Sequence, residues 1–242
     1  MSIADRKRRA WEERDRLILE TADSLLADHG YLGLNLDELA RQIEYSKATI
    51  YNHYESKEDL MLAVATTHLE TRAEFFGRAL TFEGRSRERL FVIGFADMLL
   101  AQLYPHWFSI LQLVSSPSIW DKATEERHMQ HEQSSERCMK AALEIIRQAR
   151  VAGDLPEDSP SDQHILAGLV GMAKGSHLLA YGPGGFPPEL NLKPLDLLFD
   201  NYQIYLDGTG WKPLGNEWDY DQTLVRIREE LFTKESAIEV HS

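Results

Sequence analysis

The sequence predicts an all-α protein, and three observations support this fold class. Apolar residues recur at helical spacing along most of the chain, and residues typical of helix N-caps precede several of these stretches. No segment alternates apolar and polar residues as a half-buried strand does. With 242 residues, 43% of them hydrophobic, the chain is long enough for a sizeable core. We expect an N-terminal head over residues 1–60 and a larger body over residues 61–242.

The first expected helix carries one apolar stripe. Its members follow i, i+4, i+7, i+8 and i+11 spacing, which is typical of an amphipathic helix: Ile18, Ala22, Leu25, Leu26 and His29. Gly30 follows directly and suits a helix-ending position, where glycine is common. We therefore expect this helix to end at Gly30.

Cap residues follow in close succession. Asn35 with Glu38, Ser46, and Ser56 with Asp59 are each placed to begin a helix. Such spacing predicts short helices joined by sharp turns, with one short exposed helix beginning at Lys47. Two short helices joined by a tight turn form a helix-turn-helix, whose second helix enters the major groove of DNA.

The body is expected to contain longer helices, about ten in the whole chain. Their breaks are marked by Gly84, by Tyr104-Pro105, by Gly153 with Pro156, and by the loop at residues 182–188. The expected helical ranges are 57–80, 87–103, 107–114, 119–150, 161–181, 194–206 and 219–233. The C-terminal segment, 211–242, has three open interpretations: it caps the body, extends an interface, or is partly disordered.

The charge balance argues against DNA at first sight. The chain has 26 Lys and Arg against 39 Asp and Glu, a net charge of −13, whereas DNA-binding domains more often carry a basic footprint. Phosphate contact, however, needs only a few well-placed cations. The run Arg6 to Arg9 has two open interpretations, an arm that contacts DNA or a solvated tail.

Other classes of protein are disfavoured by what the sequence lacks. No stretch is apolar for the roughly 20 residues that a membrane span needs, and no signal peptide is visible. The single cysteine, Cys138, fits a reducing cytoplasm. Sequence motifs of common enzymes are absent, so we expect neither an enzyme nor a cofactor. His128 and His131 have a spacing that can chelate a metal, but in a polar stretch we interpret them as a solvated face, with no metal.

Several residues near the third helix suit DNA contact. Lys47, Ala48 and Thr49 are small or polar residues at its start, which allows close approach to base edges, and Asn52 is expected to point outward. Lys57 lies in the first turn of a helix, where a cation is unfavourable unless it faces an anion such as a phosphate. The alternative for all of them is an ordinary solvated helix start.

The segment SKATIYNHYESKEDL, residues 46–60, together with the apolar pattern before it, resembles the TetR family of bacterial transcriptional regulators. The resemblance covers roughly residues 14–62. It implies a three-helix DNA-binding head, an α-helical ligand-binding and dimerisation body, and release from DNA when a small molecule binds. Tyr51 and His53 match positions at which the family contacts phosphates and the groove. The expected partner is double-stranded DNA.

One residue departs from the family's pattern. The family usually has glycine in the helix-turn-helix turn, where this chain has Glu44. A left-handed backbone there would strain a glutamate by about 1 kcal/mol, and the carboxylate would lie near DNA. Glu44 and the net charge favour an alternative function, an all-α interaction or ligand-sensing module that does not bind DNA.

The body is rich in aromatic residues and methionine. Each is individually expected in core packing, but as a set they predict a pocket for a small, largely apolar effector. The expected lining residues are Phe95, Met98, Trp107, Phe108 and Trp120, with Gln133 and His177 as polar anchors.

Gly168, Gly171 and Gly175 lie inside an expected helix, where each glycine costs up to about 1 kcal/mol relative to alanine. Gly171 and Gly175 are one turn apart and open one face to another helix. The resemblance implies a four-helix bundle across a two-fold axis, made by residues 161–181 and 194–206. The alternative is close packing within one chain. A homodimer would suit a palindromic operator, and repression is the expected outcome of binding, with activation left open.

Overall fold

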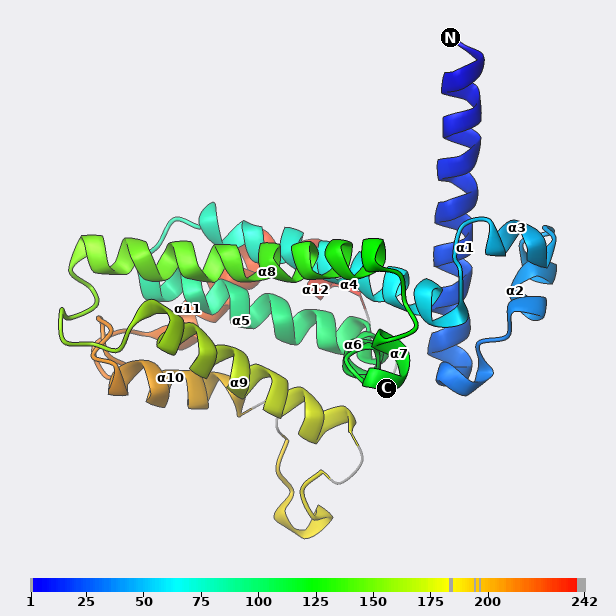
Figure 1. The fold of residues 1–242 in the computed structure, drawn as a ribbon. Helices are drawn as coiled ribbons and strands as arrows, with labels where there is room; N and C mark the ends of the chain where they lie inside the picture. The colour runs from blue at the N-terminus through cyan, green and yellow to red at the C-terminus, as the bar shows by residue number, and fades with distance from the viewer. Residues whose placement is uncertain (1, 183–184, 194, 196, 239–242) are drawn as a thin grey trace. The chain divides into compact units, whose positions relative to one another are not determined.

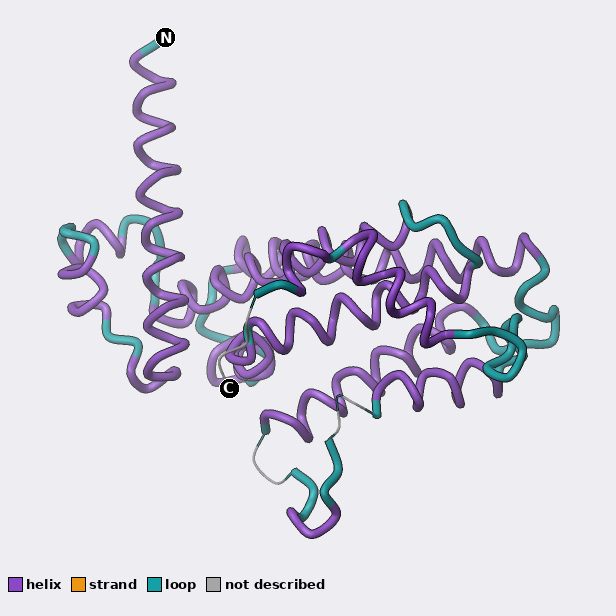
Figure 2. Tube along the Cα trace, turned by 180° about the vertical axis from the view of Figure 1, so that it is seen from behind, coloured by secondary structure: helices purple, strands orange, loops and turns teal. Residues whose placement is uncertain are grey.

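The computed structural model describes residues 2–182, 185–193, 195 and 197–238, and its regular structure within these ranges is helical (Figures 1 and 2). The longer α-helices are α1 (Ile3–Gly33), α4 (Lys57–Gly77), α5 (Ser86–Leu103), α6 (Pro105–Val114), α8 (Glu125–Ala152), α9 (Asp162–Tyr181), α10 (Leu198–Gly208) and α11 (Tyr220–Leu231). The shorter elements are α2 (Leu36–Gln42), α3 (Lys47–Tyr51), α7 (Pro117–Trp120), α12 (Thr233–Ser236), and the 3-10 helices η1 (Arg78–Leu80) and η2 (Pro188–Leu190).

The chain forms two compact units. Unit 1 comprises Met1–Leu69 and Ser109–Ser134, and unit 2 comprises Glu70–Phe108 and Ser135–Ser242. Helices α4, α6 and α8 therefore each contribute residues to both units. The functional boundary expected at residue 60 stays a prediction.

The cap residues expected near the N-terminus begin their helices as predicted. The side chain of Asn35 accepts hydrogen bonds from the backbone N–H groups of Asp37 and Glu38, at the start of α2. Ser46 Oγ accepts from the Thr49 N–H at 3.1 Å, and Ser56 Oγ accepts from the Asp59 N–H at 2.9 Å. These bonds satisfy N–H groups that a helix start leaves unpaired.

Helix α1 extends further toward the N-terminus than the apolar stripe from Ile18 to His29 predicts. It begins after Ser2, whose side chain and that of Asp5 form a capping box, so the run Arg6 to Arg9 is helical. Near its other end, Gly30 has φ 63° and ψ −171°, which interrupts the helical backbone. The regular helix thus breaks at Gly30 as predicted, but helical residues continue beyond it to Gly33.

The core of unit 1 extends well beyond the first sixty residues. Helices α1 to α4 supply most of it, including Ile18, Leu39 and Ile50. Ile110 and Val114 of α6 and Ile119 of α7 complete the same cluster. These three side chains come from a segment that is predicted, from the sequence, to belong to the body.

The prediction of one long helix over residues 119–150 is wrong. The structure has α7 ending at Trp120 and α8 beginning at Glu125. The carboxylate of Asp59 accepts hydrogen bonds from both the N–H and the hydroxyl of Thr124, at 3.0 and 2.8 Å. Because this partner lies 65 residues away in the chain, local sequence gives no sign of the break.

In unit 2, α5 packs against α10 and α11, and α9 packs against α10. Residues 194 and 196, at the start of the helix expected over 194–206, lie outside the described residues, as do 183 and 184 of the expected loop. The segment after α10 is well packed as far as it is described: Trp211 and Phe232 are fully buried. For residues 211–238 the structure supports a cap on the body, whereas residues 239–242 lie outside the described residues.

Candidate nucleic-acid interface and buried polar cluster

The turn between α2 and α3 has the left-handed backbone that the sequence analysis anticipated. Glu44 has φ 59° and an exposed side chain. Its neighbour Tyr45 donates its N–H to the Ala40 carbonyl at 3.0 Å, which closes the turn. A tight turn of this kind fixes the angle between the two helices of a helix-turn-helix.

Helix α3 is buried on one side and open on the other. Ile50 is 1% exposed and anchors the helix in the unit 1 core. The exposed residues are Lys47, Ala48, Tyr51 and Asn52. These residues gather on a surface with small, aromatic and amide side chains, which can follow a groove and its base edges.

Two of the predicted contact residues at the start of α3 already have local partners. The Lys47 ammonium lies 2.9 Å from a carboxylate oxygen of Asp37, and this hydrogen bond raises the pKa of Lys47. The half-buried Thr49 shares a hydrogen bond with the Ser46 hydroxyl at 2.9 Å. The Lys47–Asp37 pair is exposed, so it contributes little to stability and can open toward a phosphate.

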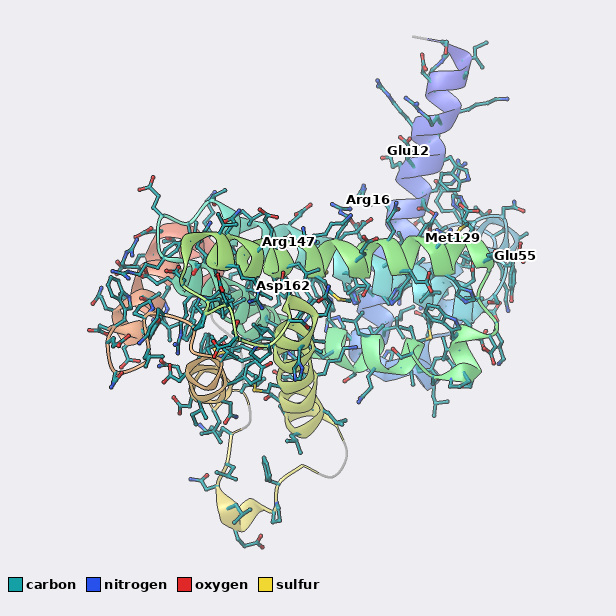
Figure 3. The ribbon with its side chains drawn as sticks, turned by 60° about the vertical axis from the view of Figure 1, so that its left-hand side comes forward. Glu12, Arg16, Glu55, Met129, Arg147 and Asp162 are labelled. Carbon is teal, nitrogen blue, oxygen red and sulfur yellow. The ribbon has the colours of Figure 1, made fainter. Side chains whose placement is uncertain are left out.

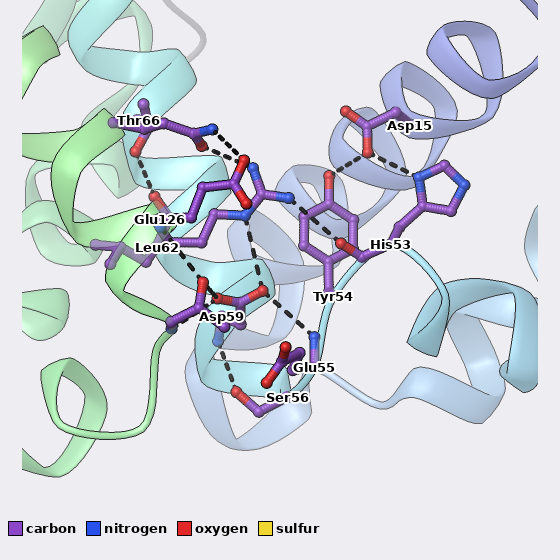
Figure 4. A network of polar contacts seen from close by, with 12 residues as sticks. Asp15, His53, Tyr54, Glu55, Ser56, Asp59, Leu62, Thr66 and Glu126 are labelled. Carbon is purple, nitrogen blue, oxygen red and sulfur yellow. Dashed lines mark hydrogen bonds and ion pairs between the residues drawn. The ribbon is translucent and has the colours of Figure 1, made fainter. Parts of the chain in front are cut away.

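His53 lies inside unit 1. Its side chain is 2% exposed, and Nδ1 lies 3.0 Å from Asp15 Oδ1. The ring stacks on that of Trp11 at 4.4 Å between centroids. Tyr54 also donates its hydroxyl to Asp15, at 2.7 Å (Figure 4). His53 thus fixes α1 to the chain just after α3, and its predicted DNA contact stays a prediction.

Lys57 is half-buried and directed at the end of α1. Its ammonium donates to the Tyr31 carbonyl at 2.6 Å and lies 4.3 Å from the centre of the Tyr31 ring. Burial lowers the pKa of Lys57. The carbonyl groups of a helix end attract cations, so this contact gives a structural reason for a lysine at the start of α4. The predicted phosphate contact stays a proposal.

Unit 2 contains a charged cluster with little exposure to solvent. Arg72 Nε donates to Asp97 Oδ1 at 2.8 Å, and His177 Nε2 lies 2.9 Å from Asp97 Oδ2. Burial alone would raise the pKa of the Asp97 carboxyl, but Arg72 and His177 outweigh burial and hold the pKa below its ordinary value. Asp97 is therefore a carboxylate, which can only accept hydrogen bonds.

This carboxylate fixes which ring nitrogen of His177 donates a hydrogen bond. Nε2 must carry a proton to donate to Asp97, so in the neutral ring Nδ1 is an acceptor. Nδ1 is buried and has no hydrogen-bond partner within the described part of the chain. Phe108 stacks on the ring at 3.7 Å between centroids, and the Arg72 guanidinium lies over the Phe76 and Phe108 rings. An apolar setting with one unpaired nitrogen suits a ligand that is mostly apolar with one polar end.

The other residues of the predicted effector site are divided between the units. The structure brings Phe108 and His177 together. Elsewhere in unit 2, Phe95 packs on Phe232, Trp107 stacks on Tyr104, and Met98 is half-buried. Trp120 and Gln133 belong to unit 1, where Trp120 stacks on His128 at 4.3 Å and Gln133 is exposed.

Sequence reasoning missed Arg72 and Asp97. A usable signal was present for Asp97, because it is the single charged residue in the apolar stretch LFVIGFADMLLA, residues 90–101. A carboxylate there must be paired to be buried. Within the described residues, no group of three or more potential ligands is placed to hold a metal, and no helix is long and apolar enough to cross a membrane.

The three glycines of α9 have different surroundings. A Cβ on Gly168 would come 2.3 Å from the Tyr205 hydroxyl of α10, so this glycine serves close packing within one chain. A Cβ on Gly171 or Gly175 would meet nothing within 4 Å. The open face of α9 therefore begins at Gly171, and the alternative of packing within the chain holds for Gly168.

Comparison with known sequences gives matches concentrated in unit 1. Residues 18–64 match the family model described as bacterial regulatory proteins, tetR family. The HTH-type transcriptional activator FasR of Mycolicibacterium smegmatis is 33% identical over 90 residues, 36% of this chain and 41% of FasR. The HTH-type transcriptional repressor AcnR of Corynebacterium diphtheriae is 26% identical over 149 residues, 62% of this chain and 72% of AcnR. The matched stretch thus spans less than half of FasR.

Comparison with solved structures extends the likeness to the whole fold. The crystal structure of the transcriptional regulator FadR from Bacillus subtilis in complex with stearoyl-CoA superposes with a TM-score of 0.63. The match covers 80% of this chain and 98% of that chain, at 13% sequence identity. At this identity the likeness concerns the fold: an all-α chain with an N-terminal helix-turn-helix and a helical body.

Proposed function

We propose that this chain, a member of the TetR family of bacterial regulatory proteins, is a transcriptional regulator that binds a palindromic operator as a homodimer. The observation that carries the proposal is α3, which follows a tight turn and exposes Lys47, Ala48, Tyr51 and Asn52 while Ile50 anchors it. Two copies related by a two-fold axis would present two such helices to successive major grooves.

Selection of duplexes from a random DNA library by the purified protein tests this function. We expect enrichment of a palindrome whose binding weakens steeply with salt. Tyr51→Ala and Asn52→Ala should each lower the affinity at least tenfold without changing the oligomeric state. Lys57→Ala tests its phosphate contact in the same assay. If no sequence is enriched, the alternative function, a ligand-sensing module that does not bind DNA, is favoured.

We further propose that the protein represses transcription from the cytoplasm and is released from DNA by a small, largely apolar effector. The buried cluster of Arg72, Asp97 and His177 supports an effector with one polar end, since His177 Nδ1 lacks a partner among the described residues. A reporter driven by the selected operator distinguishes repression from activation. Both activities occur among the similar proteins, since FasR is described as an activator and AcnR as a repressor.

A thermal-shift screen of fatty acids, acyl thioesters and aromatic acids and alcohols tests the effector. We expect a ligand that raises the melting temperature and dissociates the protein from its operator. His177→Phe retains the stacking on Phe108 and removes the nitrogen atoms, so it should abolish the shift while DNA binding persists. A ligand that raises the melting temperature of the wild type and of His177→Phe equally would contradict the role of His177.

A further inference from the structure

The first turns of α1, residues 3–13, contain no buried side chain. Residues 6–13 are all exposed, and the first side chains of α1 that pack in the unit 1 core are Leu17 and Ile18. In Figure 1 this part of α1 projects beyond α2 and α3, which belong to the same unit, and Glu12 and Arg16 lie along it in Figure 3. A helical segment that is exposed on all sides gains little from packing in the core, so its presence needs another reason.

Its charge is opposite to that of the molecule. Residues 2–11 carry four cations and the single carboxylate of Asp5, whereas the whole chain has a net charge of −13. Arg8 forms an exposed ion pair with Glu12 at 3.6 Å. Arg6, Lys7 and Arg9 make no ion pair within the described part of the chain. About one turn of the helix thus presents largely unneutralised positive charge to solvent, which attracts polyanions.

The direction of this helix is fixed relative to α3. Trp11 stacks on His53, and Asp15 accepts hydrogen bonds from His53 and Tyr54. His53 lies two residues after the end of α3. At 1.5 Å of rise per residue, Arg6 is only about 8 Å along the axis from Trp11. The cations are therefore held in a fixed direction relative to the helix-turn-helix of the same unit.

We propose that the run Arg6, Lys7, Arg8 and Arg9 forms a rigid arm that contacts the phosphate backbone of DNA outside the base pairs read by α3. The proposal rests on the proposed DNA-binding function and adds a second contact surface to it. Phosphates are the complementary partner because they form a dense, regular array of negative charge. The arm adds affinity and lengthens the bound site, but phosphate contacts carry no base preference of their own.

The test uses the full chain and the duplex selected by the wild-type protein, in two lengths. The short duplex ends at the palindrome, and the long one adds about six base pairs on each side. The variant replaces Arg6, Lys7, Arg8 and Arg9 by Gln, which retains helix propensity. Its control replaces four exposed cations of unit 2 by Gln, for the same change in net charge: Arg137, Lys140, Arg147 and Lys234.

We expect the arm variant to bind the long duplex roughly ten- to a hundredfold more weakly than the wild type. The slope of the logarithm of the binding constant against the logarithm of the salt concentration should become shallower by about 2–3 for each bound protomer. The wild-type protein and the control should bind the long duplex more tightly than the short one, and the arm variant should not. Equal salt slopes for the arm variant and the wild type would overturn the proposed phosphate contact. Equal losses of DNA affinity in the arm variant and the control would overturn it as well. If the wild type selects no duplex, the proposed function itself fails, which is a separate result.

Discussion

Glu44 shows how a single residue can set the stability of the turn. Its φ of 59° lies in the left-handed region, which costs a residue with a Cβ about 1 kcal/mol. Glu44→Gly should therefore raise the free energy of unfolding by about 0.5–1 kcal/mol, after allowance for the greater freedom of glycine in the unfolded chain. Removing the carboxylate should also tighten DNA binding. Denaturant titration and an operator binding curve measure the two effects.

Glu44→Gln separates the effect of the strained backbone from the effect of the carboxylate charge. It removes the charge but retains the strained backbone, so it should tighten DNA binding without the gain in stability. Equal stability of the glycine variant and the wild type would show that the turn is not strained.

His131 makes unit 1 sensitive to acid. Burial, with the neighbouring His128, lowers the pKa of His131 to about 4, against about 6.5 in an unfolded chain. Between these values the unfolded state binds more protons, so stability falls as the pH drops from about 7 to 4. His131→Gln removes this titration and should reduce the fall in melting temperature between pH 7 and pH 5.

His164 offers the matched comparison, since its side chain is exposed on α9. His164→Gln should leave the fall in melting temperature as it is in the wild type. Identical pH profiles for the two variants would contradict a special role for His131.

At the scale of elements, Arg127 joins the start of α8 to the segment after α3. Its guanidinium donates to the His53 carbonyl at 3.3 Å, lies 3.7 Å from a carboxylate oxygen of Asp59 and packs over the Tyr54 ring. Figure 4 shows Tyr54 and Asp59 within this network. Arg127→Met retains the apolar stem and leaves the Asp59 carboxylate, which is 2% exposed, without its cation.

We expect Arg127→Met to destabilise unit 1 by about 2 kcal/mol, because a buried carboxylate loses a charged partner. Hydrogen exchange of the amides of residues 50–60 should quicken, and operator affinity should fall. Arg147, an exposed arginine on the same helix (Figure 3), is the control: Arg147→Met should change neither quantity. Equal exchange rates in the two variants would remove Arg127 from this role.

The elements themselves could mostly be predicted from the sequence, because caps and breakers act locally. Asn35, Ser46 and Ser56 begin their helices as expected. The break before α8 could not be predicted, since it depends on Asp59, far away in the chain. The candidate sites divide in the same way: exposure on α3 follows from its short amphipathic pattern, whereas the pairing of Arg72 with Asp97 joins two helices and leaves only a lone buried charge as a signal.

At the scale of the whole molecule, buried charge shows how unit 2 holds its C-terminal segment. Arg87 is fully buried, and its guanidinium donates to Asp207 and to the carbonyl groups of Trp211 and Pro213, at 2.6, 2.8 and 3.0 Å. While these bonds hold the C-terminal segment on unit 2, α9 and α10 keep exposed residues. The exposed residues of these two helices include Gly171, Leu178 and Ile204, and the last two are 46% and 71% exposed.

An apolar face of two adjacent helices, opened by Gly171, is suited to a two-fold helix bundle. We expect the wild-type protein to be a dimer by light scattering after size-exclusion chromatography. Gly171→Arg combined with Ile204→Arg should shift it to a monomer, because two guanidinium groups would be buried without partners at the interface. On the operator, the monomer should lose binding that depends on both half-sites and retain only weak half-site binding. Val151, 91% exposed near the end of α8, supplies the control, and Val151→Arg should remain a dimer with unchanged affinity. A double variant that stays dimeric would place the interface elsewhere, and the free face of α9 would then need another partner.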